Sequence, residues 1–313
     1  MITTVTLNAS IDKAYHMTSA IENGTVMRVS KTCNSAGGKG INVARIIKTC
    51  GSDVQATGLV GGYNGAYLEK LLDQDGISHN FEHIKGETRS CINILDPKYS
   101  STEYLEVGCT VDCEEEKSFL ERFDQIIQES DVITISGSAP QGISKDIYKK
   151  MVEMVKKAGK KVFLDTSGEL LERGLEAKPD LVKPNKDEIE ALFHIKIDNR
   201  DDVITYARKI YDMGIPNVVI SLGGEGAILV CEKGIYQAKP PKVEVVNTVG
   251  CGDSMVGAFA VAMERGFNPE DALCYAVVVA TANALSASTG SFDPAECAKI
   301  EKGTKVTELL GGK

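Results

Sequence analysis

The chain has 313 residues, of which 42% are hydrophobic and 25% charged, enough for one large globular domain. Its net charge is −9, and lysines and arginines are dispersed among acidic residues, which argues against nucleic acid as a partner. The nine cysteines form no CxxC pair and no long apolar run is present. The sequence therefore indicates neither a structural zinc site nor a membrane partner, and we expect a cytoplasmic protein with reduced thiols.

Strand-like and helical patterns alternate along most of the chain. Strands are predicted at 1–7, 53–61, 132–136, 161–165 and 218–222, and helices at 66–73, 145–157, 169–173 and 201–213. The last third is more helical, with alanine-rich apolar helices at 254–265 and 269–286. This alternation predicts an α/β fold in which helices cover both faces of a mostly parallel central sheet.

Two insertions interrupt the alternation, at about 13–34 and 78–107. They contain only short strand-like pieces, at 14–18, 26–32, 80–84, 91–95 and 103–107. Strands from two separate insertions are expected to pair in a small β-sheet beside the main sheet, and such a sheet has an apolar face to hide. We therefore expect a single domain over residues 1–313 whose small sheet forms a lid and a homodimer surface.

Polar residues follow the first predicted strand directly, in the segment Leu7-Asn8-Ala9-Ser10-Ile11-Asp12. Ligands of open parallel sheets bind beyond the carboxyl ends of the strands, where the Asp12 carboxylate can accept hydrogen bonds from sugar hydroxyls. A turn closed by the polar side chains of this segment is the alternative.

A glycine-rich turn, Gly37-Gly38-Lys39-Gly40, precedes the first amphipathic helix. The glycine spacing is not that of a P-loop, and no Ser or Thr follows Lys39. The N–H groups of the turn and the Lys39 charge can still hold a hydroxylated or phosphorylated ligand. A plain glycine-rich turn is the alternative.

Asn185 and Glu188 have the spacing of a capping box at a helix start. The same two oxygen-bearing side chains can face a hydrated Mg²⁺ or nucleotide phosphates, and both interpretations stay open. Further along, Ser221 and the run Gly223-Gly224-Glu225-Gly226 lie between two strand-like segments. A nucleotide can lie across this backbone, and a simple hairpin turn is the alternative.

The run Gly250-Cys251-Gly252-Asp253 stands where a polar strand end meets an apolar helix. Unpaired N–H groups and the helix dipole favour anionic oxygens at such a point, and glycines let the backbone approach a phosphate. Asp253 in the first helical turn can accept a proton from a hydroxyl that attacks phosphorus. An ordinary N-terminal cap is the alternative.

Together these segments resemble the PfkB branch of the ribokinase-like carbohydrate kinases over nearly the whole chain. The two signatures of that family match residues 37–44 and 249–257, and its NxxE motif matches Asn185 to Glu188. The resemblance implies a ribokinase-like three-layer α/β/α sandwich with a small β-sheet lid. Residues 7–12, 88–89 and 136–140 are most similar to the hexose-phosphate kinases of the family, the 1-phosphofructokinases and tagatose-6-phosphate kinases.

The resemblance implies ATP-dependent phosphorylation of a ketohexose monophosphate to a bisphosphate. Phosphorylation of fructose 1-phosphate is expected first, and tagatose-6-phosphate kinase activity is the alternative. A non-catalytic sugar-phosphate sensor on a kinase fold is the alternative from another class. By similarity Asp253 is the catalytic base, beside an anion hole formed by the N–H groups of Gly250, Cys251, Gly252 and Asp253. A thiol at a helix N-terminus can also be oxidisable, so a redox role of Cys251 stays open.

The resemblance also assigns binding residues. The sugar hydroxyls are assigned to Asp12, Gly38 and Asn42. The phosphate already on the substrate is assigned to Lys39, Arg28, Arg89 and Ser138. ATP is assigned to Asn185, Ser221, Gly223, Gly224, Glu225, Gly226, Gly252 and Asn283, the last near the nucleotide base. Mg²⁺ is expected near Asn185 and Glu188, mainly through water.

Overall fold

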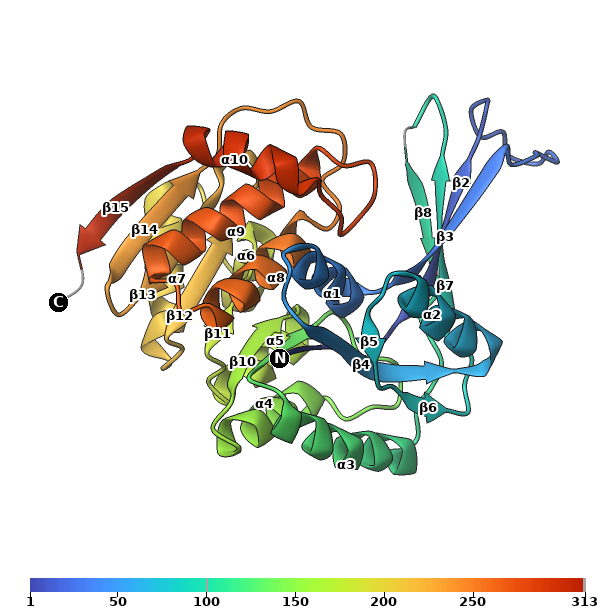
Figure 1. Cartoon of the computed structure of the whole chain (residues 1–313), viewed down its shortest axis with the longest axis horizontal. Coiled ribbons are helices and arrows are strands. Elements are labelled where there is room, and N and C mark those ends of the chain that lie inside the picture. Colours follow the sequence, from blue (N-terminus) through green and yellow to red (C-terminus); the bar gives the residue numbers. More distant parts are fainter. Residues whose placement is uncertain (100, 312–313) are drawn as a thin grey trace.

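The computed structural model describes residues 1–99 and 101–311. Within these residues it has one large twisted sheet with helices on both faces and a small four-stranded sheet that stands off to one side (Figure 1). This is the three-layer α/β/α arrangement with a small extra sheet that the sequence predicts. Residues 100, 312 and 313, which the predicted single domain includes, lie outside the described residues.

The large sheet is parallel through most of its width. Its order is β15 (Lys305–Gly311), β14 (Gly234–Lys239), β13 (Ala227–Cys231), β12 (Asn217–Ser221), β11 (Leu181–Val182), β10 (Lys161–Asp165), β9 (Val132–Ser136), β1 (Ile2–Thr6), β4 (Val54–Gly61) and β5 (Ser78–His79), with β6 (Glu82–Ile84) also on β4. Pairing is parallel from β5 and β6 to β12 and antiparallel among β12 to β15. The predicted mostly parallel sheet is confirmed.

Helices cover both faces of this sheet, most of them through one apolar side, whereas α8 and α9 are buried on nearly all sides. One face carries α1 (Lys39–Thr49), α2 (Gly62–Gln74), α8 (Cys251–Glu264) and α9 (Pro269–Ala284), with α10 (Pro294–Gly303) packed on α9. The other carries α3 (Cys113–Glu129), α4 (Ile147–Lys157), α5 (Gly168–Glu176), α6 (Lys186–Phe193) and α7 (Arg200–Asp212). Each face therefore has its own hydrophobic core, as parallel strands buried on both sides require.

The small sheet has the order β3 (Lys31–Gly37), β2 (Ser10–His16), β7 (Arg89–Leu95) and β8 (Thr102–Leu105). Strands from both predicted insertions pair in it, because β2 lies parallel to β7. The strand predicted at 80–84 was expected in the small sheet, and this is wrong. Strands β5 and β6 of this region pair instead with β4 in the main sheet. Phe81 and Ile84 are buried in the main cores, and this burial holds the segment there. The second insertion therefore contributes strands to the small sheet only from Arg89 onward, and not from residue 78.

The predicted strand at 26–32 is also shifted. Strand β3 begins at Lys31, and Val26 is 95% exposed in the connection that follows β2. This connection extends at the outer end of the small sheet in Figure 1. Val26 is β-branched, and such residues favour strands in a sequence pattern. In the structure Val26 precedes β3 and pairs with no described strand.

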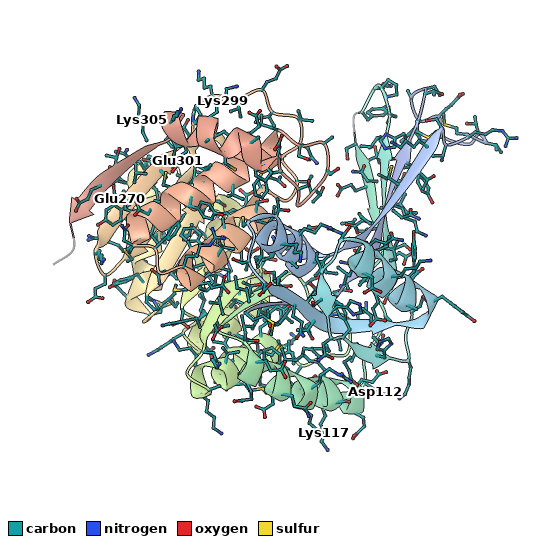
Figure 2. All side chains as sticks on the ribbon, in the orientation of Figure 1. Asp112, Lys117, Glu270, Lys299, Glu301 and Lys305 are labelled. Atoms are coloured by element: carbon teal, nitrogen blue, oxygen red, sulfur yellow. The ribbon has the colours of Figure 1, made fainter. Side chains whose placement is uncertain are left out.

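Charged side chains of both signs alternate on the surface, as the composition indicates. In Figure 2, Asp112 at the N-cap of α3, Lys117 on α3, and Lys299 and Glu301 on α10 point to the periphery of the molecule. Within the described part of the chain, no helix combines the length and apolarity needed to cross a membrane.

Candidate active site

The predicted base and two predicted binding residues meet where helices α1 and α8 begin. Asp253 lies in the first turn of α8 and is 5% exposed. Lys39 Nζ of α1 is 2.9 Å from Asp253 Oδ1, and Asn42 Nδ2 donates to Asp253 Oδ2 at 2.9 Å. The fold thus brings together residues 211 positions apart in the chain, and both carboxylate oxygens of Asp253 are held by donors.

The start of α8 has the geometry of an anion site. Gly250 caps the helix at φ 83°, and a Cβ there would lie 2.9 Å from the Gly290 nitrogen, so this position requires glycine. Among the described residues, the N–H groups of Gly252 and Asp253 have no protein acceptor. Free N–H groups at the positive end of a helix are suited to a phosphoryl oxygen.

A buried ion network extends this site below α8. Asp165, the last residue of β10, has Lys39 Nζ at 3.0 Å from Oδ2 and Lys183 Nζ at 3.2 Å from Oδ1. The side chains of Asp165 and Lys183 are only 2% and 4% exposed. Lys183 Nζ also lies 3.2 Å from the point that a Cβ on Gly252 would occupy, so its charge sits under the anion site.

The charges of this network stabilise one another. Burial opposes the charge on Asp165, but Lys183 and Lys39 outweigh it and lower the pKa of the carboxyl. Burial likewise opposes the charge on Lys39, but Asp253 and Asp165 outweigh it and raise the pKa of the ammonium. Lys39 therefore remains a cation between two carboxylates.

Asp165 and Lys183 are site residues that the sequence motifs do not include. A usable signal was present, because each is a charged residue that ends an apolar run at the carboxyl end of a parallel strand. That edge of an open parallel sheet is where ligands bind. The rule that singled out Asp12 would also have found these two residues.

Asp12 lies at the root of the small sheet. Its Oδ1 accepts a hydrogen bond from Ser10 Oγ at 2.7 Å, and its carboxyl group covers Gly37 so closely that a Cβ there would collide with it. Burial raises the pKa of Asp12, although Ser10 and Arg45 oppose the shift. The glycine of the first signature therefore makes room for the carboxylate at this position.

The predicted phosphate ligands are not all brought together. The Arg89 guanidinium donates to the carbonyl oxygen of Asn8 through Nε and Nη2, and to that of Glu106 through Nη1. Asn8 Nδ2 in turn donates to Ser138 Oγ at 3.2 Å, so Arg89 and Ser138 both contact Asn8, just beyond the end of β1. Arg28 is exposed on the distant β2–β3 connection. Its phosphate role stays a prediction.

Asn185 and Glu188 form the capping box of α6. Glu188 N donates to Asn185 Oδ1, and Asn185 N donates to Glu188 Oε2, each at 2.8 Å. Burial raises the pKa of Glu188, against the opposing Asn185 N–H. Asn185 also forms a bridge with Ser221, which places this helix start beside the next predicted nucleotide segment. Capping is thus confirmed, and Mg²⁺ binding stays a prediction.

The run from Ser221 to Gly226 is a hairpin turn. It leaves β12, forms one 3₁₀ turn at Gly223–Glu225 and enters β13, and Glu225 Oε2 pairs with Lys239 Nζ at 2.6 Å. The predicted strand–turn–strand order is confirmed. A nucleotide contact of this turn stays a prediction.

Asn283 is fully buried and braces the loop before α8. Its Nδ2 donates to Val249 O at 3.1 Å and to Cys251 Sγ at 3.4 Å, and its Oδ1 accepts from Ser291 N at 3.1 Å. Both ends of the amide are engaged, which does not favour its predicted contact with a nucleotide base. Burial raises the pKa of Cys251, so a reactive thiolate at this helix start is not supported either.

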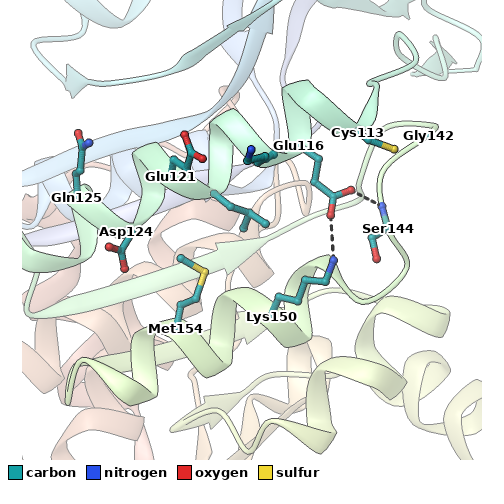
Figure 3. A pocket seen from close by; sticks show the side chains of 11 residues that line it. Cys113, Glu116, Glu121, Asp124, Gln125, Gly142, Ser144, Lys150 and Met154 are labelled. Atoms are coloured by element: carbon teal, nitrogen blue, oxygen red, sulfur yellow. Dashed lines mark hydrogen bonds and ion pairs between the residues drawn. The ribbon is translucent and has the colours of Figure 1, made fainter.

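A separate groove lies between α3 and α4 (Figure 3). Leu120 and Met154 line it, and Glu116 accepts from Ser144 N at 2.7 Å and pairs with Lys150 Nζ at 3.2 Å. The main sheet separates these helices from α1 and α8. The groove is therefore not part of the site around Asp253.

Comparisons with known proteins agree with this geometry. Residues 5–296 match the model of the pfkB family carbohydrate kinases. The chain is 36% identical over 291 residues to the 1-phosphofructokinase of Bacillus subtilis, covering 93% of this chain and 95% of the relative. It is also 36% identical over 313 residues to a tagatose-6-phosphate kinase of Staphylococcus epidermidis, covering 99% and 100%.

Solved structures give the same result. Phosphofructokinase-2 from Escherichia coli in complex with potassium aligns with a TM-score of 0.90 at 28% identity, covering 96% of this chain and 98% of that one. A tetrameric inhibited form of the same enzyme aligns at 0.89 and 29% identity, with the same coverage. Since the family model and these relatives span nearly the whole chain, the protein belongs to the PfkB family of carbohydrate kinases.

Proposed function

We propose that this kinase transfers the γ-phosphoryl group of ATP to a hydroxyl of a ketohexose monophosphate, with fructose 1-phosphate as the first candidate substrate. The observation that carries the proposal is the Asp253 carboxylate beside the free N–H groups at the start of α8, with Lys39 and Asn42 holding it. The name of the Bacillus relative supports fructose 1-phosphate. The name of the Staphylococcus relative makes tagatose 6-phosphate the second candidate.

In the proposed reaction, Asp253 takes the proton of the sugar hydroxyl as its oxygen bonds to the γ-phosphorus. The bond between that phosphorus and the β–γ bridging oxygen breaks, and ADP leaves with the electron pair. The N–H groups of Gly252 and Asp253 stabilise the charge on the transferring group. Because phosphoryl transfer depends mainly on positioning and charge stabilisation, a preorganised anion site is the largest contribution expected from the protein.

Mg²⁺ fits the residues available at the start of α6. The capping box engages Glu188 Oε2 and leaves Oε1 for a ligand, and Asn185 lies beside the Ser221 turn. Mg²⁺ keeps several waters and takes few carboxylates, so one carboxylate oxygen suits a hydrated ion. When bound, the ion would neutralise charge on the β- and γ-phosphates.

The proposal is tested by ADP release with ATP and Mg²⁺ on fructose 1-phosphate, tagatose 6-phosphate, fructose 6-phosphate and free fructose. Turnover on one phosphosugar supports the proposal and identifies the substrate. Turnover on free fructose alone would overturn the phosphosugar assignment and leave the kinase family intact. Phosphosugar binding without turnover on any of the four would favour the sensor alternative.

Arg89→Ala is expected to raise KM for the phosphosugar by about 10- to 100-fold and to leave KM for ATP nearly unchanged. A hydrogen bond to a charged group contributes about 1.5–3 kcal/mol, and Arg89 lies against the Asn8 carbonyl just beyond β1, where we propose that the phosphosugar binds. Steady-state kinetics with each substrate varied in turn measure the difference. Arg122→Ala is the control, since Arg122 pairs with Glu82 on the main-sheet edge. Equal loss for both substrates would make Arg89 a brace of the Asn8 backbone only.

A homodimer through the small sheet is the second part of the proposal. Tyr104, Leu105 and Val107 are 58%, 62% and 68% exposed on its β8 side, and such apolar groups favour burial between chains. We expect light scattering to give twice the mass of one chain, and Leu105→Asp to shift the protein toward monomer. A monomeric mass of the unaltered protein at micromolar concentration would contradict the dimer.

A further inference from the structure

Arg45 of α1 connects three parts of the molecule that meet at the site. Its Nε donates to Asp75 Oδ2 at 2.9 Å and its Nη1 donates to Asn42 Oδ1 at 3.1 Å, while Nη2 donates to the carbonyl oxygen of Ala36. The side chain is 15% exposed. All three nitrogens of the guanidinium are thus engaged, and their directions are fixed by its planar fork.

The contact with Asn42 determines how that amide is turned. An asparagine side chain has one accepting and one donating end, and Arg45 can only donate. Arg45 therefore holds the oxygen of Asn42 and directs its Nδ2 group toward Asp253 Oδ2, 2.9 Å away. With the amide turned over, its oxygen would face the carboxylate and repel it. The two residues can share this task because positions three apart lie on the same side of a helix.

The other two contacts anchor Arg45 to the small sheet. Ala36 lies in β3 and directly precedes Gly37, the residue that Asp12 covers. Asp75 ends α2, and Tyr67 of the same helix accepts a hydrogen bond from Asn34 of β3 at 3.3 Å. The guanidinium is therefore held against the root of the small sheet from two directions.

We propose that Arg45 is a positioning residue, which orients the Asp253 carboxylate through the Asn42 amide and takes its own position from the root of the small sheet. The inference rests on the proposed function, in which Asp253 is the base. Arg45 itself contacts neither Asp253 nor the free N–H groups of α8, so its effect on the Asp253 carboxylate passes through Asn42. If Arg45 only stabilised the fold, the effect of replacing it on kcat would not depend on whether Asn42 is present.

A double-mutant cycle of Arg45→Met and Asn42→Ala tests the proposal, with kcat measured at saturating phosphosugar and ATP. Arg45→Met is expected to lower kcat about 10-fold with KM for ATP unchanged, since misplacing a reacting group is costly. In the Asn42→Ala background the same change is expected to lower kcat by less than about 2-fold, because the amide it orients is gone. Fold losses that multiply in the double variant would overturn the proposal, as would a wild-type kcat for Arg45→Met.

Two further variants keep the result interpretable. Arg265→Met is the matched control. Arg265 also contacts α1, by donating to Cys50 O, but at the far end of the helix, so the kcat of this variant is expected to match the wild type.

Asp75→Asn weakens the ion pair that holds Arg45, and Asp75 is partly exposed, so the fold should tolerate the change. This variant is expected to lower kcat about 3-fold, and it replaces Arg45→Met if Arg45→Met does not fold. A wild-type kcat for Asp75→Asn would then count against the anchor. Failure of the proposed function would appear earlier, as absence of phosphosugar turnover in the unaltered protein.

Discussion

Replacing Asp253 by asparagine is expected to lower kcat by about 10²- to 10⁴-fold while phosphosugar and nucleotide still bind. The asparagine side chain has the same size but cannot take the proton of the attacking hydroxyl. Lys39 and Asn42 bind different oxygens of the Asp253 carboxylate, so in the variant one of these two donors would face an NH2 group instead of an acceptor. Steady-state kinetics give the loss of kcat, and calorimetric titration gives the binding constants.

Asp112→Asn is a matched control for this change. Asp112 also stands at a helix start, as the cap of α3, and asparagine is an equally good cap there. Figure 2 shows it at the periphery of the molecule, and its kcat is expected to equal that of the wild type. A kcat of Asp253→Asn within tenfold of the wild type would move the role of base to another group.

Asp165→Asn is expected to destabilise the folded chain by about 3–5 kcal/mol at neutral pH, the cost typical of removing one partner from a buried charge network. The asparagine leaves the Lys183 ammonium, 4% exposed, without its carboxylate, and Lys39 keeps only Asp253. Urea unfolding followed by circular dichroism measures the loss. The surface variant Asp112→Asn is expected to leave the unfolding midpoint unchanged, since exposed ion pairs contribute little.

The pH dependence of this loss has a definite sign. Burial alone would raise the pKa of Asp165, but Lys183 and Lys39 lower it in the folded chain. Its stabilising effect is therefore fully present above the ordinary aspartate pKa of about 3.8 and is lost as the pH falls through the lower folded value. The stability difference between wild type and variant should shrink below about pH 4. A difference that grows as the pH falls would show that Asp165 is not stabilised by these cations.

The sequence predicted the main sheet well because its strands are apolar runs separated by amphipathic helices, a pattern that local residues determine. It predicted the small sheet less well. The segment 80–84 reads as a strand in either sheet, and the burial of Phe81 and Ile84 in the main cores, which no local pattern shows, decides between them.

In the site, too, features set by neighbouring residues could be predicted, and features set by the folded chain could not. Asp253 and Gly250 could be predicted because a helix start is encoded by neighbouring residues. Asp165 and Lys183 could be singled out as charged residues at strand ends, but their pairing depends on strand order, which places β10 and β11 side by side only in the folded sheet. The orientation of Asn42 by Arg45 depends further on side-chain geometry, which residue spacing alone does not give.

The strand order has a consequence for how the protein is made. From β9 onward, each strand of the main sheet pairs with the one before it, so the sheet can extend outward in the order of synthesis without opening an existing pair. The exception is α8, which returns after β14 to pack on α1 and β9 near the middle of the sheet. Since α8 carries Asp253, a growing chain can assemble most of the sheet and the Lys39–Asp165–Lys183 cluster before it acquires the proposed catalytic base. If Asp253 is the base, we expect a partly synthesised chain that lacks α8 to be unable to transfer phosphate even where its sheet is already compact.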